Sequence, residues 1–187
     1  MALEKVIAHL EEQLESLRVA LDALSYPLLI DKSRTEDVAL SGYSGDALTE
    51  ITHLLGEAIP AANRARQAAK YPVDLDGMRS ALVTCQEKVV EVDKRFRNGL
   101  MSFENIEALL ALKRRRGQWG KWADTVMRGL QETQELLPLA EETIVLIWQE
   151  IAERAGTTSV SVQTTNIGQK IIAKTSEVEE MAQKEAT

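Results

Sequence analysis

The segment from Lys113 to Trp122 carries the residue types best suited to binding chemistry. Its sequence, Lys-Arg-Arg-Arg-Gly-Gln-Trp-Gly-Lys-Trp, holds five positive charges, no negative charge and two of the three tryptophans. The whole chain has a net charge of −7, so the other residues together carry −12. Basic segments rich in Trp suit anionic surfaces, because the cations neutralise phosphates and the indole rings settle at the headgroup interface. We expect an anion-binding surface here, made of Lys113, Arg114, Arg115, Arg116, Trp119, Lys121 and Trp122.

A second interpretation of the same segment is structural. Trp119 falls on the apolar repeat of the helix that follows, and Trp at such a position is commonly a core residue. In that case both tryptophans anchor a helical core, and the arginines pair with acidic residues of neighbouring helices. The sequence leaves both interpretations open.

One short motif could place metal ligands on a helix. Glu50 and His53 have the E-x-x-H spacing with which one helix offers two ligands to a di-iron centre. Such a centre needs a second E-x-x-H, and the only other histidine, His9, has Val6 three residues before it. We therefore expect no metal site.

No other pattern indicates catalysis. Cys85, the only cysteine, lies on an apolar repeat and is expected to behave as a small hydrophobe. The glycine-containing stretches 41–46 and 114–120 lack the strand, loop and Lys-Ser/Thr of a phosphate-binding loop. The carboxylates are expected on solvated helix faces. We expect a protein without enzymatic activity and without a cofactor.

Composition restricts the fold class. Of the 187 residues 27% are charged, 44% are hydrophobic and 4% are aromatic, with only 10 Gly and 4 Pro. This balance disfavours disorder, disulfide scaffolds and β-sandwiches, and predicts a soluble, mostly helical protein.

Charge and hydropathy restrict the partner and the location. A sequence pI of about 5.0 argues against nucleic acid as a partner. The acidic N-terminal stretch does not resemble a signal peptide, and no apolar run is long enough to span a membrane, so we expect a cytoplasmic location.

Hydrophobic periodicity predicts the elements. Apolar residues recur every three or four positions over 3–24, and Tyr26-Pro27 ends that helix. A second helix is expected from Asp46 to about Lys70, kinked at Pro60, with small alanines on its seam that predict the closest helix pair. A third is expected from Asp74 or Asp76 to a cap at 98–99.

The last helical block is the longest. Ser102 can start a fourth helical segment, and after a slip in register around Gly117 and Gly120 the apolar repeat resumes at Trp119. Read as one helix, residues 102–155 would form a very long rod, so a break near Gly117 or a kink at Pro138 is predicted. If this last helix outreaches its neighbours, its apolar seam needs a partner. The predicted assembly contacts there are Leu137, Ile144, Ile147, Trp148 and Ile151.

These blocks predict an all-α fold: an antiparallel bundle of about four helices with heptad-type packing and one long C-terminal helix. The bundle domain is expected over 1–156 and a polar tail over 157–187. Residues 157–165 alternate with a period of two and include Val160 and Val162, which could pair with a strand of another chain. The other interpretation of the tail is a flexible polar segment, followed by a short, weak helix at 169–184.

Two functions follow from these patterns. The first is a non-enzymatic domain for protein–protein contact or self-assembly, of scaffold or adaptor type, which acts through helix packing and its tail. A protein partner or a second copy is expected, with a homo-oligomer as the default. The second is a membrane- or polyanion-binding domain that uses segment 113–122, with the tail as the trigger of oligomerisation.

The second function is accompanied by a resemblance of layout. An all-helical domain followed by a short, polar, β-prone tail containing Gln163 and Asn166 is similar to helical cell-death effector domains that are triggered by amyloid-forming tails. The resemblance extends to layout only, because the N-terminal helix lacks the Gly-rich apolar character of a membrane-inserting segment. The partner, the pathway and the oligomeric number are not encoded in any recognisable motif.

Overall fold

The computed structural model describes residues 2–25, 27, 41–115 and 117–154. Over these residues the chain forms long helices and no strand. The elements are α1 (Leu3–Ser25), α3 (Ser41–Ala68), α4 (Leu75–Arg95), the π-helical turn η2 (Phe96–Leu100), α5 (Phe103–Lys113) and α6 (Gln118–Arg154). The predicted all-α class is confirmed for this part of the chain. The predicted tail, 157–187, lies outside it.

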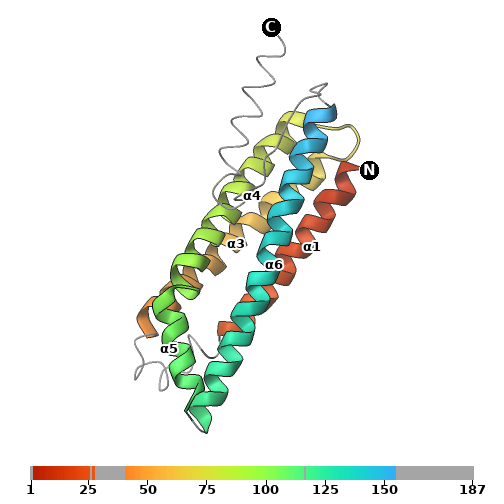
Figure 1. Ribbon diagram of the computed structural model, residues 1–187. Helices are drawn as coiled ribbons and strands as arrows, with labels where there is room; N and C mark the ends of the chain where they lie inside the picture. The colour runs from red at the N-terminus through yellow and green to blue at the C-terminus, as the bar shows by residue number, and fades with distance from the viewer. Residues whose placement is uncertain (1, 26, 28–40, 116, 155–187) are drawn as a thin grey trace.

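The long helices run alternately in opposite directions (Figure 1). α1 packs against α3 and α6, and α4 packs against the same two helices, so the four close an antiparallel bundle. α5 extends the direction of α4 beyond η2, and α6 then returns along the whole molecule. As a result, the start of α1 and the end of α6 share one end of the bundle, and the α5–α6 turn occupies the other.

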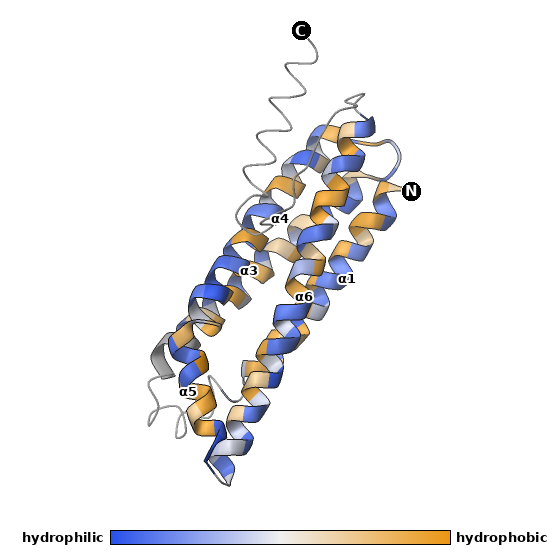
Figure 2. Ribbon diagram, in the orientation of Figure 1, coloured by the Kyte–Doolittle hydropathy of each residue, from blue (hydrophilic) through white to orange (hydrophobic). Residues whose placement is uncertain are grey.

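The predicted apolar repeats form the core. Hydrophobic residues alternate with polar ones along each helix, and their stripes face the bundle interior (Figure 2). Leu14, Leu55, Val89 and Ile144 are fully buried, one from each of the four long helices. α3 and α4 make the most extensive interhelical contact, which confirms the prediction drawn from the alanine seam. Because small side chains allow close approach, the buried alanines explain this packing: Ala58, Ala61, Ala62 and Ala65.

The predicted starts of α4 and α5 are confirmed, and the predicted start of α3 is not. Asp74 caps α4 by accepting a hydrogen bond from the Gly77 N–H at 2.9 Å, and Ser102 likewise caps α5. The prediction for α3 is wrong, because this helix begins at Ser41 and not near Asp46. A Cβ on Gly99 would lie 2.7 Å from the Cβ of Ala47, so the start of α3 packs directly on η2. Gly42 and Gly45, which have low helix propensity, lie inside α3, so local propensity did not indicate where the helix begins.

The interruptions also differ in part from expectation. Gly117, with a φ of 88°, separates α5 from α6 as predicted. α3 continues through Pro60 and α6 through Pro138. The predicted cap at 98–99 is instead part of η2, and the Asn105 side chain donates a hydrogen bond to the Gly99 carbonyl at 2.9 Å. η2 therefore joins α4 to α5 where the sequence predicted a helix cap.

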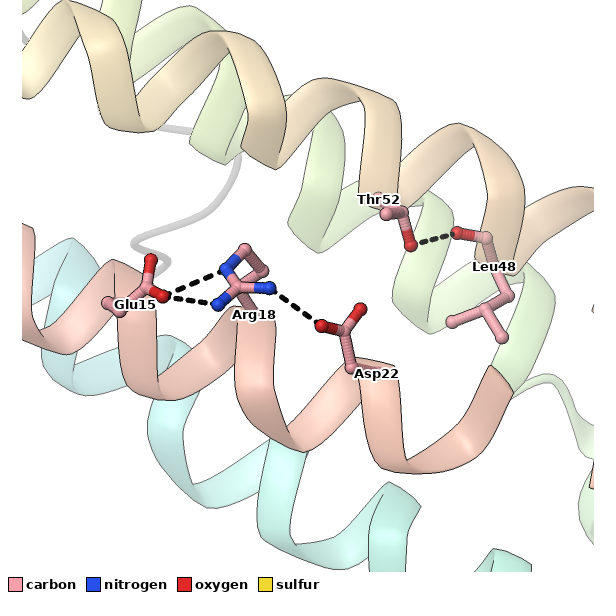
Figure 3. Close-up of polar contacts among 5 residues, drawn as sticks. All are labelled: Glu15, Arg18, Asp22, Leu48 and Thr52. Atoms are coloured by element: carbon pink, nitrogen blue, oxygen red, sulfur yellow. Dashed lines mark hydrogen bonds and ion pairs between the residues drawn. The ribbon is translucent and has the colours of Figure 1, made fainter. Parts of the chain in front are cut away.

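The outward face of α1 carries the charged residues that its pattern predicts. Arg18 donates to Glu15 and, at 2.7 Å, to Asp22, all on consecutive turns (Figure 3). The hydrogen bond from Arg18 lowers the pKa of Glu15. On α3, the Thr52 hydroxyl donates a hydrogen bond to the Leu48 carbonyl oxygen at 2.8 Å. Exposed pairs of this kind define the solvated side of a helix and add little stability.

Candidate anion-binding tip

The predicted basic segment lies at the α5–α6 turn, at the far end of the bundle from the start of α1 (Figure 1). Two glycines permit this turn. Gly117 adopts the left-handed conformation that favours glycine, and a Cβ on Gly120 would collide with the Arg115 carbonyl oxygen. The tight reversal therefore presents the basic residues at one extremity of the molecule. We call Lys113, Arg114, Arg115 and Lys121 the basic tip.

All four cations of the basic tip are exposed. Lys113 lies 3.5 Å from Asp124, a carboxylate that Arg128 also contacts at 3.3 Å. Among the residues that the structure describes, no carboxylate lies within ion-pair distance of Arg114, Arg115 or Lys121. The pairing of arginines with neighbouring helices is therefore not found for Arg114 and Arg115. Arg116 lies outside the described residues. The basic tip thus has cations to offer an external anion.

The two tryptophans near the basic tip serve mainly the core. Trp122 is 5% exposed, and its indole Nε1 donates a hydrogen bond to the Pro27 carbonyl at 3.3 Å. Trp119 is half-buried and packs edge-on against Trp122, with ring centroids 6.3 Å apart. This placement corrects the expectation that Trp122 belongs to the binding surface. The interaction available to the basic tip is therefore chiefly electrostatic, with Trp119 partly accessible beside it.

The five predicted assembly contacts on α6 all lie inside the bundle. Their exposed fractions are 8% for Trp148 and 2% or less for Leu137, Ile144, Ile147 and Ile151. The predicted apolar overhang is therefore wrong, because α6 is covered along these positions by its neighbours, chiefly α1. The apolar residues that α6 does expose are Leu139 and Leu146. Val160 and Val162 lie outside the described residues.

The E-x-x-H pair is not assembled into a site. The His53 side chain is 77% exposed and its Nε2 lies 3.1 Å from Glu57. Glu50 instead forms an ion pair with Arg95 of α4. Within the described ranges no three His, Cys, Asp or Glu side chains group as metal ligands. Likewise, none of the helices described is long and apolar enough to cross a membrane.

The sequence interpretation missed a set of buried polar groups between α4 and α6. Gln86 and Asp93 on α4, and Glu141 and Trp148 on α6, are each at most 8% exposed. On each helix the two residues are seven positions apart and next to the apolar seam. This heptad spacing was the one sequence feature that could have indicated that both polar residues of a helix lie on the same face. However, it could not reveal that the two polar pairs face each other across one interface.

No protein-family model, no curated protein and no solved structure matches the chain.

Proposed function

We propose that the protein is a non-enzymatic helical binding domain that docks through its basic tip onto an anionic surface, with an anionic membrane face as the preferred partner. The observation that carries the proposal is the exposed group Arg114, Arg115 and Lys121, which has no carboxylate partner in the described part of the chain. Each cation near an anionic bilayer contributes about 1 kcal/mol to binding. Several cations on one turn therefore give reversible, salt-dependent attachment.

The geometry favours this function over the α6-mediated assembly that the sequence first predicts. Assembly through Ile144, Ile147 and their neighbours would require side chains that the bundle core already covers. The basic tip is instead exposed at the α5–α6 turn, and the buried Trp122 that follows it on α6 donates a hydrogen bond to the Pro27 carbonyl. Docking therefore needs no rearrangement of the core. A cytoplasmic location is part of the same proposal. Self-assembly through the tail is also part of it, because an assembly carries several basic tips and would bind the surface with higher avidity.

The charge-reversal variant Arg114→Glu/Arg115→Glu tests the proposal, with Arg64→Glu/Lys70→Glu as a matched control. Both variants change the net charge equally, and Arg64 and Lys70 are exposed near the end of α3, at the opposite end of the bundle. The assay is co-sedimentation with vesicles of phosphatidylserine and phosphatidylcholine. Loss of two cations alone should weaken binding roughly thirtyfold, and the two added anions should weaken it further, whereas the control should bind as the wild type does.

Four outcomes separate the alternatives. Binding that decreases with salt and depends on the basic tip supports the proposal. Equal loss in both variants would show that only net charge matters, and absence of vesicle binding would overturn the membrane partner. Tip-dependent binding to heparin or to polyglutamate, but not to vesicles, would instead identify a soluble polyanion or an acidic protein. Light scattering with and without residues 157–187 tests the self-assembly component.

A further inference from the structure

Two carboxyl groups meet in the apolar interface between α4 and α6. Asp93 is 4% exposed and Glu141 is 1% exposed. Asp93 accepts a hydrogen bond from Arg97 Nε at 3.0 Å, and the Arg97 side chain itself is 54% exposed. Neither oxygen of Glu141 accepts a hydrogen bond from a donor in the described part of the chain. Across the interface, the carboxyls of Glu141 and Asp93 are near enough for each to act on the other electrostatically.

The charges around this pair do not balance if both carboxyls are ionised. The groups that act on Glu141 are Asp93 and Arg97 across the interface and Glu142 on its own helix. Those that act on Asp93 are Arg97 and Glu141. One half-exposed guanidinium therefore serves two buried carboxylates. A buried charge without a partner is costly, so one of the carboxyls is expected to retain a proton.

The proton belongs on Glu141. Arg97 stabilises the ionised form of Asp93, and a protonated Glu141 can donate its O–H to an Asp93 oxygen, which gives Glu141 a hydrogen-bond partner. Burial, together with the neighbouring Asp93, raises the pKa of Glu141 to about 8, against the opposing effect of Arg97. Burial also raises the pKa of Asp93, with Arg97 acting against it.

The α4–α6 interface is the place where such a pair has most effect. Of the four contacts between neighbouring long helices it is the least extensive. The second polar contact across it, from Trp148 to Gln86, involves no group that titrates near neutral pH. Electrostatic repulsion between Asp93 and Glu141 would therefore act on the pair of neighbouring long helices that makes the fewest packing contacts.

We propose that the α4–α6 interface is a pH-sensitive latch, closed by the proton that Glu141 donates to Asp93 and loosened when base removes that proton. Loss of the proton leaves two like charges in an apolar interface with a single cation. α4 and α6 then separate around this position, and water reaches the carboxylates. The proposal is independent of anion binding by the basic tip.

The sign of the pH dependence follows from the two states of Glu141. In an unfolded chain the pKa of Glu141 has the ordinary value for a glutamate, 4.5, whereas in the folded chain it is raised to about 8. Between these values the folded state binds more protons than the unfolded state, so stability falls as pH rises through the window and levels off above it. One linked proton changes the unfolding equilibrium constant by at most about tenfold per pH unit.

The test compares urea unfolding of the wild type, Glu141→Gln and Glu142→Gln between pH 5 and pH 9. The amide introduced by Glu141→Gln keeps a donor for Asp93 and does not titrate, while Glu142 is exposed and serves as the matched control. We expect the wild type and Glu142→Gln to lose stability toward pH 9, and Glu141→Gln to lose much less. A pH profile of Glu141→Gln identical to that of the wild type would overturn the latch.

Hydrogen exchange at pH 6 and pH 9, corrected for intrinsic rates, locates the opening. Amides around Asp93 and Glu141 should exchange faster at pH 9 in the wild type, and those of α1 should not. If Glu141→Gln does not fold, Asp93→Asn replaces it and should make the profile shallower, because it removes the like charge beside Glu141 while the burial of Glu141 remains. Carboxyl-carbon NMR of the wild type gives an independent result: titration of Glu141 at the ordinary pKa of a glutamate, 4.5, would contradict the proposal directly.

Discussion

The indole Nε1 of Trp148 on α6 donates a hydrogen bond to Oε1 of Gln86 on α4, with 2.5 Å between the two atoms. Both side chains are buried. One heptad away along each helix, Asp93 faces Glu141, so the two pairs share one antiparallel register. A slip of α4 against α6 would break both pairs and leave buried polar groups without partners. These pairs therefore specify how the two helices align.

Removal of the Gln86 side-chain amide should destabilise the fold. Gln86→Leu leaves the Trp148 indole N–H without this acceptor, at a cost of about 1–3 kcal/mol. Trp148→Phe should cost less in the Gln86→Leu background than in the wild type, because the indole donor that it removes has already lost its acceptor there. Urea unfolding of both single variants and the double variant measures the coupling. Gln67→Leu on the exposed side of α3 is the control, and strict additivity of the two single changes would argue against the contact.

Two helical glycines should respond oppositely to alanine. A Cβ on Gly129 of α6 would lie 2.5 Å from Leu24 Cδ2 of α1, whereas a Cβ on Gly56 of α3 meets nothing within 4 Å. Gly129→Ala should cost about 1–3 kcal/mol through overpacking. Gly56→Ala should stabilise by roughly 0.5–1 kcal/mol, because alanine loses less backbone entropy in a helix. Thermal melts of the two variants provide the comparison, and a stabilising Gly129→Ala would contradict the observed α1–α6 approach.

Cys85 should be inert in the folded protein. Its side chain is fully buried, and burial raises the pKa of the thiol to about 12. Because the thiolate is the reactive species, a thiol reagent at pH 8 should modify the native protein only through unfolding. The same reagent in denaturant should label one thiol per chain at once. Fast labelling of the native protein would show that the α3–α4 packing around Cys85 opens readily.

Gly117 should be required for the geometry of the basic tip. Its φ of 88° places it in the left-handed region, where alanine is strained by roughly 1–2 kcal/mol. Gly117→Ala should therefore lower the melting temperature, and Gly117→Asn should lower it less, since asparagine tolerates this conformation better. Gly56→Ala serves as the reference for alanine at an unhindered helical glycine. Equal effects of alanine and asparagine at position 117 would indicate a different turn.

Much of the fold follows from local patterns. The repeat of apolar residues identified the buried side of α1, α4 and α6, because a helix of 3.6 residues per turn brings such residues onto one stripe. Asp74 and Ser102 marked helix starts through cap chemistry that involves only neighbouring residues. The start of α3 at Ser41 was not predicted in this way, because Gly42 and Gly45 have low helix propensity and yet lie inside the helix.

The candidate site was only partly predictable. The charge of the basic tip is a property of composition and spacing, so Arg114 and Arg115 were identified directly. The burial of Trp122 depends on where Pro27 comes to lie, 95 residues earlier in the chain. The apolar seam of α6 was recognised, yet whether Ile144 faces a second protein or this chain's own helices is a question of tertiary packing.

By itself, the sequence determined the helices, their apolar stripes and the concentration of positive charge between 113 and 122, since each of these depends on residues close together in the chain. Only the tertiary structure decided which stripes meet and which polar groups face one another. Asp93 and Glu141 are 48 positions apart and look like ordinary solvated carboxylates in the sequence. They become a buried acid pair because the antiparallel return of α6 along α4 removes both of them from water.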